Sequence, residues 1–423
     1  MKTTIWVMNH YAGGMLFDHG GRHYNFVKYL KESEYDPIVF CANSKHNAAG
    51  CWFESSALWH EHMAEEIGVP FVFVNARAYT GNGKQRVLNM ADFYRNVKKA
   101  AKAYAKVHGT PDIIYASSVH PLTLVAGIQL AKYFGIECIC EMRDLWPEGI
   151  VVAYPNRLSR QQPLIRLLYQ GEKWIYKKAD KLIFTMEGGA QYIADRGWDT
   201  AHGGPIDLKK VFHINNGVDL ATFNYNRDNF PVEDADLDNP DIFKVVYTGS
   251  IRRVNNLSLL VDAAKAVTDP RIKFLIWGEG DELPALRQRL VDERIENVVF
   301  KGRVDKKYIP SIVSRADLNI AHNMSSPLFC YGISFNKIFD YLAAGKPIFS
   351  DFPCKYNPTV QYGAGTDLEQ PSAQAIARSI QDFCALSPAE YTVYQKNAVR
   401  AAEEYDFANL TKKLIAVIED CVG

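Results

Sequence analysis

Short apolar runs alternate with longer amphipathic segments along the whole chain, and this alternation constrains the fold more than any other feature. The runs are rich in Val, Ile, Phe and Tyr and are apolar on both faces, which is typical of parallel strands covered by helices on two sides. Segments with a helical period lie between them, for example at 21–33, 89–108 and 121–134. In the first half of the chain, strands are expected at 3–9, 37–42, 70–75, 112–116, 137–142, 181–186 and 211–215.

The same rhythm restarts after residue 240 and predicts a second doubly wound α/β lobe. Its strands are expected at 243–248, 272–277, 297–300, 317–321 and 347–350. The intervening segment is acidic, contains two prolines and has no hydrophobic period, which is typical of a linker. Residues 388–421 have a helical pattern with a break near Asp406. We therefore expect a first lobe at 1–224, a linker at 225–240, a second lobe at 241–395 and terminal helices at 396–423 that cross back to the first lobe.

The charge balance bears on partners and location. Lys and Arg total 48, as do Asp and Glu, so the basic excess typical of nucleic-acid binding is missing and no nucleic-acid partner is expected. No apolar run is long enough to span a membrane, and the chain starts without the pattern of a signal peptide. These features predict a cytoplasmic protein.

Cysteine, histidine and aspartate spacings give no sign of a metal site. The eight cysteines lack CxxC spacing, and Cys138 and Cys140 are two apart in an expected strand, so we interpret the cysteines as reduced and mostly in the core. The DxD pair Asp234 and Asp236 lies in the expected linker rather than at the end of a buried strand. We expect neither a metal nor any other cofactor.

Glycines gather in the loop that follows the first expected strand. Gly13 and Gly14, then Gly20 and Gly21, precede Arg22 at the start of a helix. Paired glycines let backbone N–H groups approach an anion at a helix start, whereas a purely structural βα turn needs about one glycine. The spacing is not a GxGxxG fingerprint. An anion site and a plain turn both remain open here.

The segment 331–347 predicts a loop, a helix and a stop. With Ser334 as the expected N-cap, Asn336, Lys337 and Asp340 share one helical face. A cation suits a nucleotide diphosphate, and a carboxylate suits the two hydroxyls of a ribose. An intrahelical pair between Lys337 and Asp340 explains the same spacing, and both interpretations stay open.

The sequence GISFNKIFDYLAAGKPI in this segment resembles the donor-binding segment of glycosyltransferase family 4. Other stretches are similar to that family in the same order, including YTGSIRRVNNLSLLVDAAK, IWGEGDELPAL, VVFKGRV, NNGVD, SSVHP and EMRDLWPE. The resemblance covers nearly the whole chain. It implies the GT-B fold, in which two Rossmann-like lobes face an interlobe cleft and a C-terminal helix returns to the first lobe. Within the family the chain most resembles the bacterial O-antigen and capsule branch, and there the N-acetyl-fucosamine transferases.

The resemblance also implies roles for individual residues. Asp340 would hold the donor ribose and Lys337 the diphosphate, while His120 would meet the donor sugar. Asp144 would lie on the acceptor side and guide the attacking hydroxyl. The remaining donor-binding positions that it implies are Gly13, Gly14, Gly278, Arg303, Val304, Gly332, Ile333, Ser334 and Asn336.

Two departures from the family pattern concern charge. The family has two glutamates eight residues apart, and these fall on Gly332 and Asp340. Its arginine and lysine after the first strand of the second lobe fall on Ser250 and Asn255. Arg252 and Arg253 are then the candidates to neutralise the phosphates, with Arg252 in a catalytic role.

The implied activity is retaining transfer of a sugar without a metal. The donor would be a nucleotide-sugar, expected to be a UDP-linked N-acetylated sugar, and the acceptor a lipid-linked saccharide or a growing surface polysaccharide. The leaving diphosphate can take the proton, so the chain mainly has to stabilise negative charge. A nucleotide-sugar epimerase of the same fold and a non-catalytic nucleotide-sugar sensor are the alternatives.

A mixed basic and apolar segment at 157–178 predicts weak contact with a membrane surface. Six Lys and Arg residues accompany Leu164, Leu167 and Trp174, a combination suited to an anionic lipid surface. The protein would then be peripheral on the inner face of the plasma membrane. The alternative is that Leu164, Leu167, Leu168 and Ile175 pack on the sheet.

Overall fold

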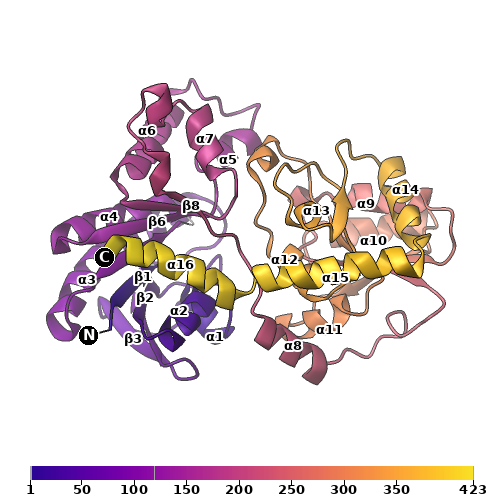
Figure 1. Cartoon of the computed structure of the whole chain (residues 1–423), viewed down its shortest axis with the longest axis horizontal. Coiled ribbons are helices and arrows are strands. Elements are labelled where there is room, and N and C mark those ends of the chain that lie inside the picture. Colours follow the sequence, from indigo (N-terminus) through magenta and orange to yellow (C-terminus); the bar gives the residue numbers. More distant parts are fainter. Residues whose placement is uncertain (1, 119, 423) are drawn as a thin grey trace. The chain divides into compact units, whose positions relative to one another are not determined.

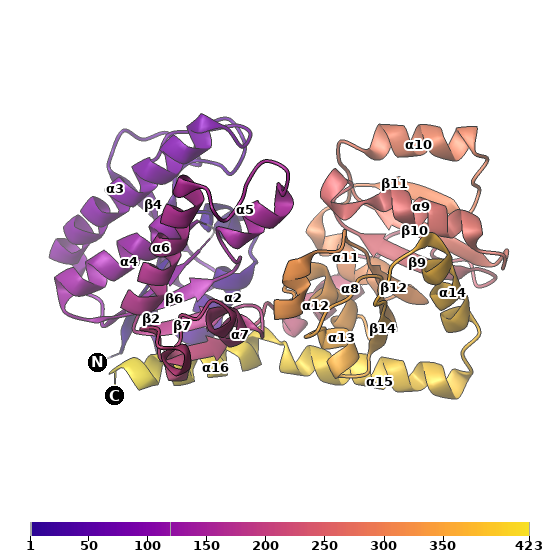
Figure 2. The same cartoon turned by 90° about the horizontal axis from the view of Figure 1, so that it is seen from above.

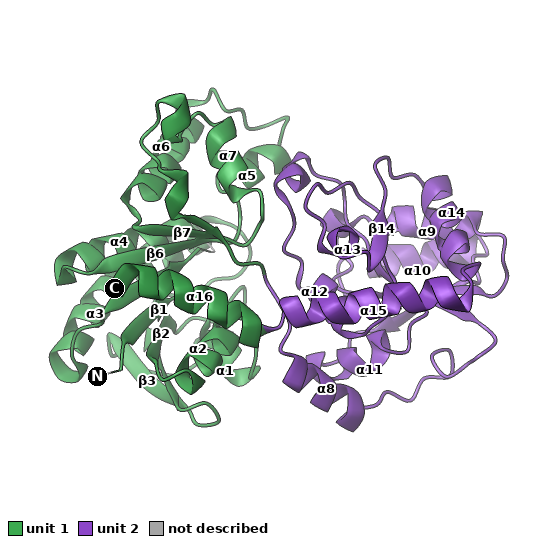
Figure 3. Cartoon of the chain, viewed as in Figure 1, with its two compact units in different colours: residues 1–215, 407–423 green, residues 216–406 purple. Residues whose placement is uncertain are grey.

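The structure, a computed structural model, describes residues 2–118 and 120–422. The chain forms two compact units (Figure 1). Unit 1 comprises residues 1–215 and 407–423, and unit 2 comprises residues 216–406 (Figure 3). Each unit contains one mainly parallel sheet with helices packed on it, so the expected α/β fold with two Rossmann-like lobes is confirmed.

The sheet of unit 1 has eight strands. In spatial order they are β3 (Trp59–Ala64), β4 (Val69–Val74), β2 (Asp36–Ala42), β1 (Thr4–Met8), β5 (Ile113–Ser117), β6 (Glu137–Met142), β7 (Lys181–Phe184) and β8 (Val211–His213). All neighbours are parallel except β3, an edge strand that pairs antiparallel with β4. The strand order reverses between β1 and β5, which are in register with Ile5 opposite Ile113. The loops after these two strands therefore meet at the carboxyl edge of the sheet.

The helices of unit 1 cover both faces of this sheet. They are α1 (Gly13–Phe17), α2 (Arg22–Glu32), α3 (Lys84–His108), α4 (Pro121–Phe134), α5 (Glu148–Ala153), α6 (Pro163–Lys178), α7 (Gly189–Asp195) and α16 (Phe407–Val422), with 3₁₀ turns η1 (Thr200–His202) and η2 (Leu208–Lys210). Figure 2 shows α3 and α4 on one side of the sheet and α16 on the other. Helix α4 has proline in its first turn and ends at Gly135, whose φ of 72° closes the helix in a left-handed conformation.

The C-terminal helix α16 belongs to unit 1. Leu410, Leu414 and Ile418 recur every four residues and are buried, and the Phe407 ring lies 5.3 Å from that of Phe26 on α2. This apolar stripe packs against α2. The helix preceding it belongs to unit 2, and the helical break expected near Asp406 is confirmed.

The sheet of unit 2 has six parallel strands. In spatial order they are β11 (Val298–Gly302), β10 (Ile272–Trp277), β9 (Phe243–Thr248), β12 (Leu318–Ala321), β13 (Ile348–Ser350) and β14 (Gly365–Asp367). The order reverses between β9 and β12, and open sheets of this kind bind ligands at the carboxyl edge next to such a reversal. The loops after β9 and β12 are therefore the first place to look for a nucleotide site.

The helices of unit 2 alternate with its strands along the chain. They are α8 (Leu220–Asn229), α9 (Leu257–Ala266), α10 (Leu283–Asp292), α11 (Ile309–Val313), α12 (Asn336–Ala343), α13 (Pro358–Gln361), α14 (Ala373–Cys384) and α15 (Pro388–Glu404), with 3₁₀ turns η3 (Arg253–Asn255), η4 (Lys306–Tyr308) and η5 (Pro327–Tyr331). Helix α9 packs against α14, and α12 packs against α15. A capping box between Ser387 and Glu390 starts α15.

The expected linker at 225–240 is instead part of unit 2. Helix α8 runs through its beginning, and the unit boundary lies between residues 215 and 216, ahead of the expected boundary at 224. Acidic residues gave this stretch its linker character. They are fixed by unit 2, because Asp234 and Asp236 both contact the ammonium of Lys301 and Asp238 pairs with Arg315.

Two strands were not expected from the sequence, β3 and β14. Strand β3 is exposed along most of its length and β14 has three residues, so neither carries a continuous apolar run. His60 and His62 lie exposed on this edge strand.

Candidate functional site

Helix α12 in unit 2 carries Lys337, and the structure places its ammonium among neutral acceptors. Nζ lies 3.3 Å from the hydroxyl of Tyr247 on β9 and 3.4 Å from the carbonyl oxygen of His322, which follows β12. It also lies over the Tyr247 ring, 4.3 Å from the centroid. Lys337 therefore sits at the carboxyl edge of the sheet, where the strand order reverses.

The Lys337 ammonium forms no ion pair with any described residue. An intrahelical pair with Asp340, the alternative open at the level of sequence, is not formed between these two described side chains. Burial lowers the pKa of Lys337 to about 8, against the opposing influence of Asp351. With a pKa of about 8 the amine is still mostly protonated at neutral pH, and an anionic ligand beside it would favour the protonated form further.

The carboxyl group of Asp351 contacts a buried histidine, His322. Its Oδ2 contacts Nδ1 of His322, while Nε2 of His322 lies 2.8 Å from the carbonyl oxygen of Asn256. Since the carbonyl can only accept, His322 donates to it through Nε2, and the close contact between Nδ1 and the Asp351 carboxyl requires a second proton between those two atoms. This pair fixes the loop after β12 beside Lys337, and the sequence gave no signal for it.

Asp340 lies one turn after Lys337 and is half-buried. Burial raises the pKa of its carboxyl, and Lys306 opposes that shift. Helix α12 is anchored at the next residue, because the hydroxyl of Tyr341 accepts a 2.9 Å hydrogen bond from the backbone N–H of Thr248 at the end of β9. That bond ties the helix to the same strand end that Lys337 contacts.

The loop before α12 is organised differently from the expectation. The N-cap is Phe335 rather than Ser334, and it makes no side-chain capping bond. Asn216, from the NNGVD stretch, donates from its side-chain amide to the carbonyl oxygen of Ser334 at 2.8 Å and to Oδ1 of Asn336 at 3.0 Å. Two sequence stretches that resemble the family are thereby joined, and Ser334 and Asn336 take part in that junction.

Gly332 explains why this chain lacks the first family glutamate. Its φ is 101°, a conformation that residues with a Cβ rarely adopt, and its N–H donates to the carbonyl oxygen of Phe329 at 3.1 Å. The following residue, Ile333, is buried. The loop is therefore a turn that glycine permits.

Ser250 and Asn255 stand where the family has an arginine and a lysine. Both side chains are uncharged, and they hydrogen-bond to each other. Asn255 donates from Nδ2 to Oγ of Ser250 at 2.8 Å and to its carbonyl oxygen. Arg252 and Arg253 lie between them along the chain, are exposed, and show no ion pair with any described residue. They extend from the loop after β9, and their part in phosphate binding stays a prediction.

Gly278 closes the neighbouring turn by close backbone approach. A Cβ there would lie 1.8 Å from the carbonyl oxygen of Gly249, so only glycine fits. Its own N–H donates to the carbonyl oxygen of Gly302 at 2.8 Å. Arg303, next in the chain, is exposed and pairs with Glu279 at 2.8 Å, and Val304 is half-buried.

In unit 1 the glycine loop after β1 is packed rather than open. A Cβ on Gly13 would lie 2.7 Å from Nε1 of Trp52, and one on Gly14 would lie 3.4 Å from the same indole. The glycines of this loop therefore make room for the Trp52 ring. Their contact with a phosphate remains a prediction.

Arg22 does not serve as an anion-binding cation, contrary to the reading of the glycine loop as an anion site. Its guanidinium is buried, pairs with Glu141 at 2.7 Å, and also donates to the carbonyl oxygens of Ile214 and Asn215. The carboxylate also lies near His23 and accepts from Tyr115 and Ser117. Glu141, Arg22 and their partners form a fully buried network that fixes the centre of the sheet.

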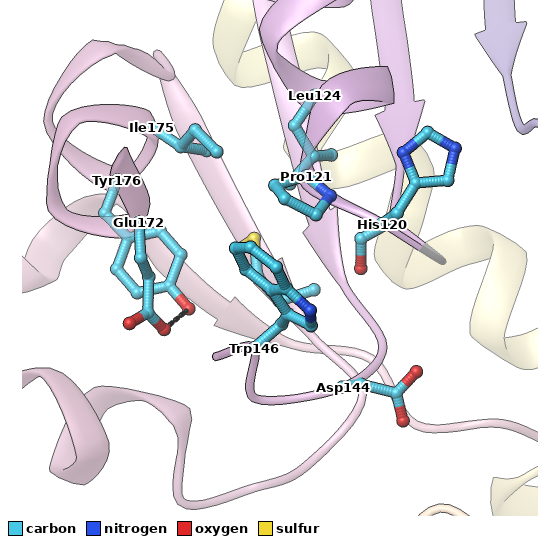
Figure 4. A pocket seen from close by; sticks show the side chains of 10 residues that line it. His120, Pro121, Leu124, Asp144, Trp146, Glu172, Ile175 and Tyr176 are labelled. Carbon is cyan, nitrogen blue, oxygen red and sulfur yellow. Dashed lines mark hydrogen bonds between the residues drawn. The ribbon is translucent and has the colours of Figure 1, made fainter. Parts of the chain in front are cut away.

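A small pocket lies where β5 and β6 end in unit 1. Figure 4 shows Trp146 between Pro121 and Leu124 on one side and Tyr176 on the other. Asp144 stands at its edge, with the carboxyl directed away from Tyr176. Desolvation raises the pKa of Asp144, opposed by Arg143. Of the unit 1 residues implied by the resemblance, His120 and Asp144 therefore line one pocket, whereas Gly13 and Gly14 do not line it.

Glu172 on α6 also lines this pocket, and the sequence gave no indication of it. Its side chain is buried, and the carboxyl accepts from the hydroxyls of Tyr176 at 2.7 Å and Tyr192 at 3.1 Å. Burial raises the pKa of Glu172 to about 8. The carboxyl is therefore largely protonated at neutral pH.

Within the described residues, no group of three or more His, Cys, Asp or Glu is arranged to hold a metal ion. The DxD pair forms ion pairs with Lys301, as described above. Cys41, Cys138 and Cys140 are buried, but four of the other cysteines are only partly buried and Cys330 is exposed, so the expectation that the cysteines lie mostly in the core is wrong.

Comparison with protein families identifies both halves of the chain. A model of the family "Glycosyl transferase 4-like domain" matches residues 21–203, and one of "Glycosyl transferases group 1" matches residues 242–384. The first match lies in unit 1 and the second in unit 2. A search of curated protein sequences returned no match.

Solved structures share the fold across nearly the full length. A UDP-forming α,α-trehalose-phosphate synthase from Burkholderia xenovorans superposes with a TM-score of 0.72 at 11% identity, covering 100% of both chains. Sucrose-phosphate synthase from Thermosynechococcus elongatus superposes with a TM-score of 0.69 at 19% identity, and the match covers 99% of both chains. HepE from Anabaena in complex with UDP gives 0.64 at 14% identity, covering 99% of this chain and 100% of the other. Because both halves match glycosyltransferase families and the fold agrees over the whole length, the chain is a glycosyltransferase of the GT-B fold.

Proposed function

We propose that this glycosyltransferase moves a sugar, with retention of configuration, from a nucleotide-sugar to a lipid-linked saccharide or a growing surface polysaccharide. The donor is a UDP-linked sugar, and an N-acetylated one is proposed from the resemblance to N-acetyl-fucosamine transferases. The observation that carries the proposal is the Lys337 ammonium at the strand-order reversal of unit 2, whose hydrogen-bond partners are the neutral Tyr247 hydroxyl and the His322 carbonyl oxygen.

The donor side of the proposal rests on unit 2. A diphosphate needs a cation, which Lys337 supplies, and Asp340 one turn later supplies a carboxylate for the ribose hydroxyls. HepE of the same fold has been solved with UDP and with UDP-glucose, which supports UDP as the nucleotide. Lys337 and the exposed Arg252 and Arg253 can stabilise the charge that grows on the leaving diphosphate without a metal.

The acceptor side of the proposal rests on unit 1. Asp144 and His120 line its pocket, where Asp144 would orient the attacking hydroxyl and His120 would contact the donor sugar. Leaving-group oxygens can accept the proton of that hydroxyl, so Asp144 need only position it.

Helix α6 supports a lipid-linked acceptor. Leu164, Leu167 and Trp174, spaced three and seven residues apart, lie on one helical face with exposed fractions of 66, 66 and 38%. Ile175 is buried and Leu168 half-buried, whereas Leu164 and Leu167 are exposed, so the expectation that all four pack on the sheet is wrong for Leu164 and Leu167. Arg166, Lys177 and Lys178 are exposed on the same helix, whereas Arg160 pairs with Glu148. In the described part of the chain no helix is long and apolar enough to cross a bilayer.

A donor panel tests this function. The protein is incubated with several UDP-sugars, with and without lipid-linked saccharides, and UDP release and product mass are followed with EDTA present or absent. We expect acceptor-dependent UDP release that EDTA does not reduce, and a product whose anomeric coupling matches that of the donor.

The alternatives give different results in the same experiment. UDP release without any acceptor product, or isomerised sugar, would indicate the epimerase. Binding without turnover for every acceptor would indicate the sensor. Loss of transfer in EDTA with recovery on adding magnesium or manganese would contradict charge stabilisation by Lys337 and arginine alone.

A further inference from the structure

Side chains from the loops after four neighbouring strands of unit 1 meet at the carboxyl edge of its sheet. Tyr11 follows β1, His46 follows β2, Arg86 lies in the first turn of α3 after β4, and His120 follows β5. The centroid of the Tyr11 ring lies 4.3 Å from that of His46 and 6.2 Å from that of His120. The Tyr11 hydroxyl accepts a 3.4 Å hydrogen bond from Nε of Arg86. Tyr11 is therefore the centre of this cluster.

Arg86 brings a positive charge that no described side chain neutralises. The residue is half-buried, and its guanidinium forms no ion pair with any described residue. Its acceptors there are neutral, namely the Tyr11 hydroxyl and, at 2.6 Å, Oδ1 of Asn82. The first turn of α3, which is fully described, contains no acidic residue, although one would be favourable beside the partial positive charge of a helix start. A bound anion would supply the missing negative charge.

The histidines of the cluster add no negative charge either. His46 contacts the hydroxyl of Tyr79 at 2.7 Å, and Nε2 of His120 contacts His10 at 2.7 Å, so neither ring is bonded to a carboxylate of a described residue. Desolvation and then Arg86 lower the pKa of His46, and the same causes lower the pKa of His120 to about 3. Both rings are therefore neutral at neutral pH, and the cluster holds the single charge of Arg86.

His120 links this cluster to the small pocket of unit 1, because it also lines that pocket together with Asp144. Open α/β sheets bind ligands at the carboxyl edge beside a reversal of strand order, which in this sheet falls between β1 and β5. Tyr11 and His120 follow these two strands. An anion held by Arg86 would thus lie near the pocket in which the acceptor is proposed to bind.

We propose that Arg86 and Tyr11 bind a phosphate group of the acceptor. That the phosphate belongs to the acceptor rests on the proposed function, which assigns the donor diphosphate to Lys337 in unit 2. A guanidinium offers several N–H donors in one plane, a geometry that matches phosphate oxygens. The Tyr11 hydroxyl accepts from Arg86, so its own hydrogen can donate to the same anion. The phosphate can come from the linkage between a saccharide and a lipid or from a soluble sugar phosphate.

Calorimetric titration with pyrophosphate tests the site without any turnover. Saturating UDP is present throughout, so that the donor site is occupied. We expect pyrophosphate still to bind the wild type, and Arg86→Gln to weaken this binding roughly 10- to 150-fold. Arg86→Lys should lose less, because it keeps a positive charge at the same place.

The matched control is Arg95→Gln, which removes an exposed arginine without an ion pair to any described residue from the same helix. It should bind pyrophosphate as the wild type does, and unfolding midpoints of all variants check that each is folded. No pyrophosphate binding to the wild type in the presence of UDP would overturn the proposal. So would equal weakening in Arg86→Gln and Arg95→Gln, or equal weakening in Arg86→Gln and Arg86→Lys.

Kinetics with three forms of one acceptor saccharide distinguish the two phosphate sources. The forms are the free saccharide, the saccharide with a phosphate at its reducing end, and the same phosphate extended by a lipid. An increase in kcat/KM with the soluble phosphate indicates a sugar phosphate, and an increase only with the lipid-linked form indicates the linkage to a lipid. In both cases Arg86→Gln should abolish the increase, and an increase that persists in this variant would overturn the proposal. The calorimetric result stays interpretable if the proposed activity fails.

Discussion

The ammonium of Lys337 lies 3.3 Å from the hydroxyl of Tyr247 and over its ring, although the two residues are 90 positions apart in the chain. The tyrosine hydroxyl in turn donates to the carbonyl oxygen of Ser250 at 3.1 Å, so it can accept from the lysine. Tyr247 thus fixes the cation at the end of β9 without neutralising it. A carboxylate in its place would compete with an anionic ligand for the same charge.

Replacing Lys337 by alanine should reduce catalysis far more than stability. Loss of a charge-assisted hydrogen bond to a phosphate costs roughly 1.5 to 3 kcal/mol, or about 10- to 150-fold in kcat/KM. Steady-state kinetics with the best UDP-sugar measure this, with the exposed Lys396→Ala on α15 as the control. Wild-type kinetics in Lys337→Ala would remove this residue from the donor site.

The pH profile of kcat/KM should carry the signature of the same lysine. The pKa of Lys337 is lowered to about 8, so the free protein loses this cation as the pH rises through 8. Because kcat/KM reports ionisations of the free protein, it should fall above that pH in the wild type. In Lys337→Ala this decrease at high pH should disappear, and kcat/KM should be lower at every pH. If the variant showed the same decrease at the same pH, another group would be its cause.

Asp340→Asn should weaken binding of the nucleoside part of the donor. An amide replaces a carboxylate that can accept from both ribose hydroxyls, and the loss is roughly 1 to 2 kcal/mol, or about 5- to 30-fold in Kd. Calorimetric titration with UDP and with inorganic pyrophosphate separates the contributions. We expect weaker UDP binding and unchanged pyrophosphate binding, with Asp382→Asn as the exposed control. Equal weakening for both ligands would argue against a ribose contact.

Glu172 should make unit 1 less stable as the pH rises. Its pKa is about 8 in the folded chain against an ordinary value of 4.5, so the folded state holds a proton that the unfolded state releases between these values. Stability therefore falls with rising pH across this window, by on the order of 3 kcal/mol at pH 7. Glu172→Gln removes the penalty, and its unfolding midpoint should rise relative to wild type from pH 5 to pH 8. The exposed Glu65→Gln should show no such trend, and a parallel trend in both would show that Glu172 is not the cause.

The exposed apolar face of α6 should bind anionic vesicles weakly. Each cation near such a surface contributes about 1 kcal/mol, so binding should be lost in high salt. Leu164→Gln together with Leu167→Gln should reduce co-sedimentation at low salt, whereas Val107→Gln, an equally exposed apolar position on α3, should not. Equal sedimentation with neutral and anionic vesicles would exclude the electrostatic part of this contact.

Most of the architecture could be predicted from the sequence because its signal is local. Strands buried on both faces must be continuously apolar, and all the expected runs became strands. The break at Asp406 and the helix over α4 are likewise set by residues within a few positions. The edge strand β3 was not predicted because its exposed face carries polar residues such as His60 and His62 in place of an apolar run.

Site chemistry was predictable only where one element carries it. Lys337 and Asp340 share a helix, so their common face follows from a spacing of three residues. Whether they pair with each other or are available to a ligand depends on Tyr247 in β9 and on His322, which follows β12. The role of Arg22 stayed open at the level of sequence for the same reason, because its partner Glu141 is 119 residues away.

The sequence by itself determined the two α/β lobes, the helical C-terminus and the segment that carries the donor-site candidates. Only the tertiary structure decided that Lys337 forms no ion pair with a described residue, that Arg22 is neutralised, and that Glu172 holds a proton. The physical reason is that secondary structure follows from apolar periodicity along the chain. The charge and protonation state of a side chain instead depend on desolvation and on partners brought together by strands distant in sequence.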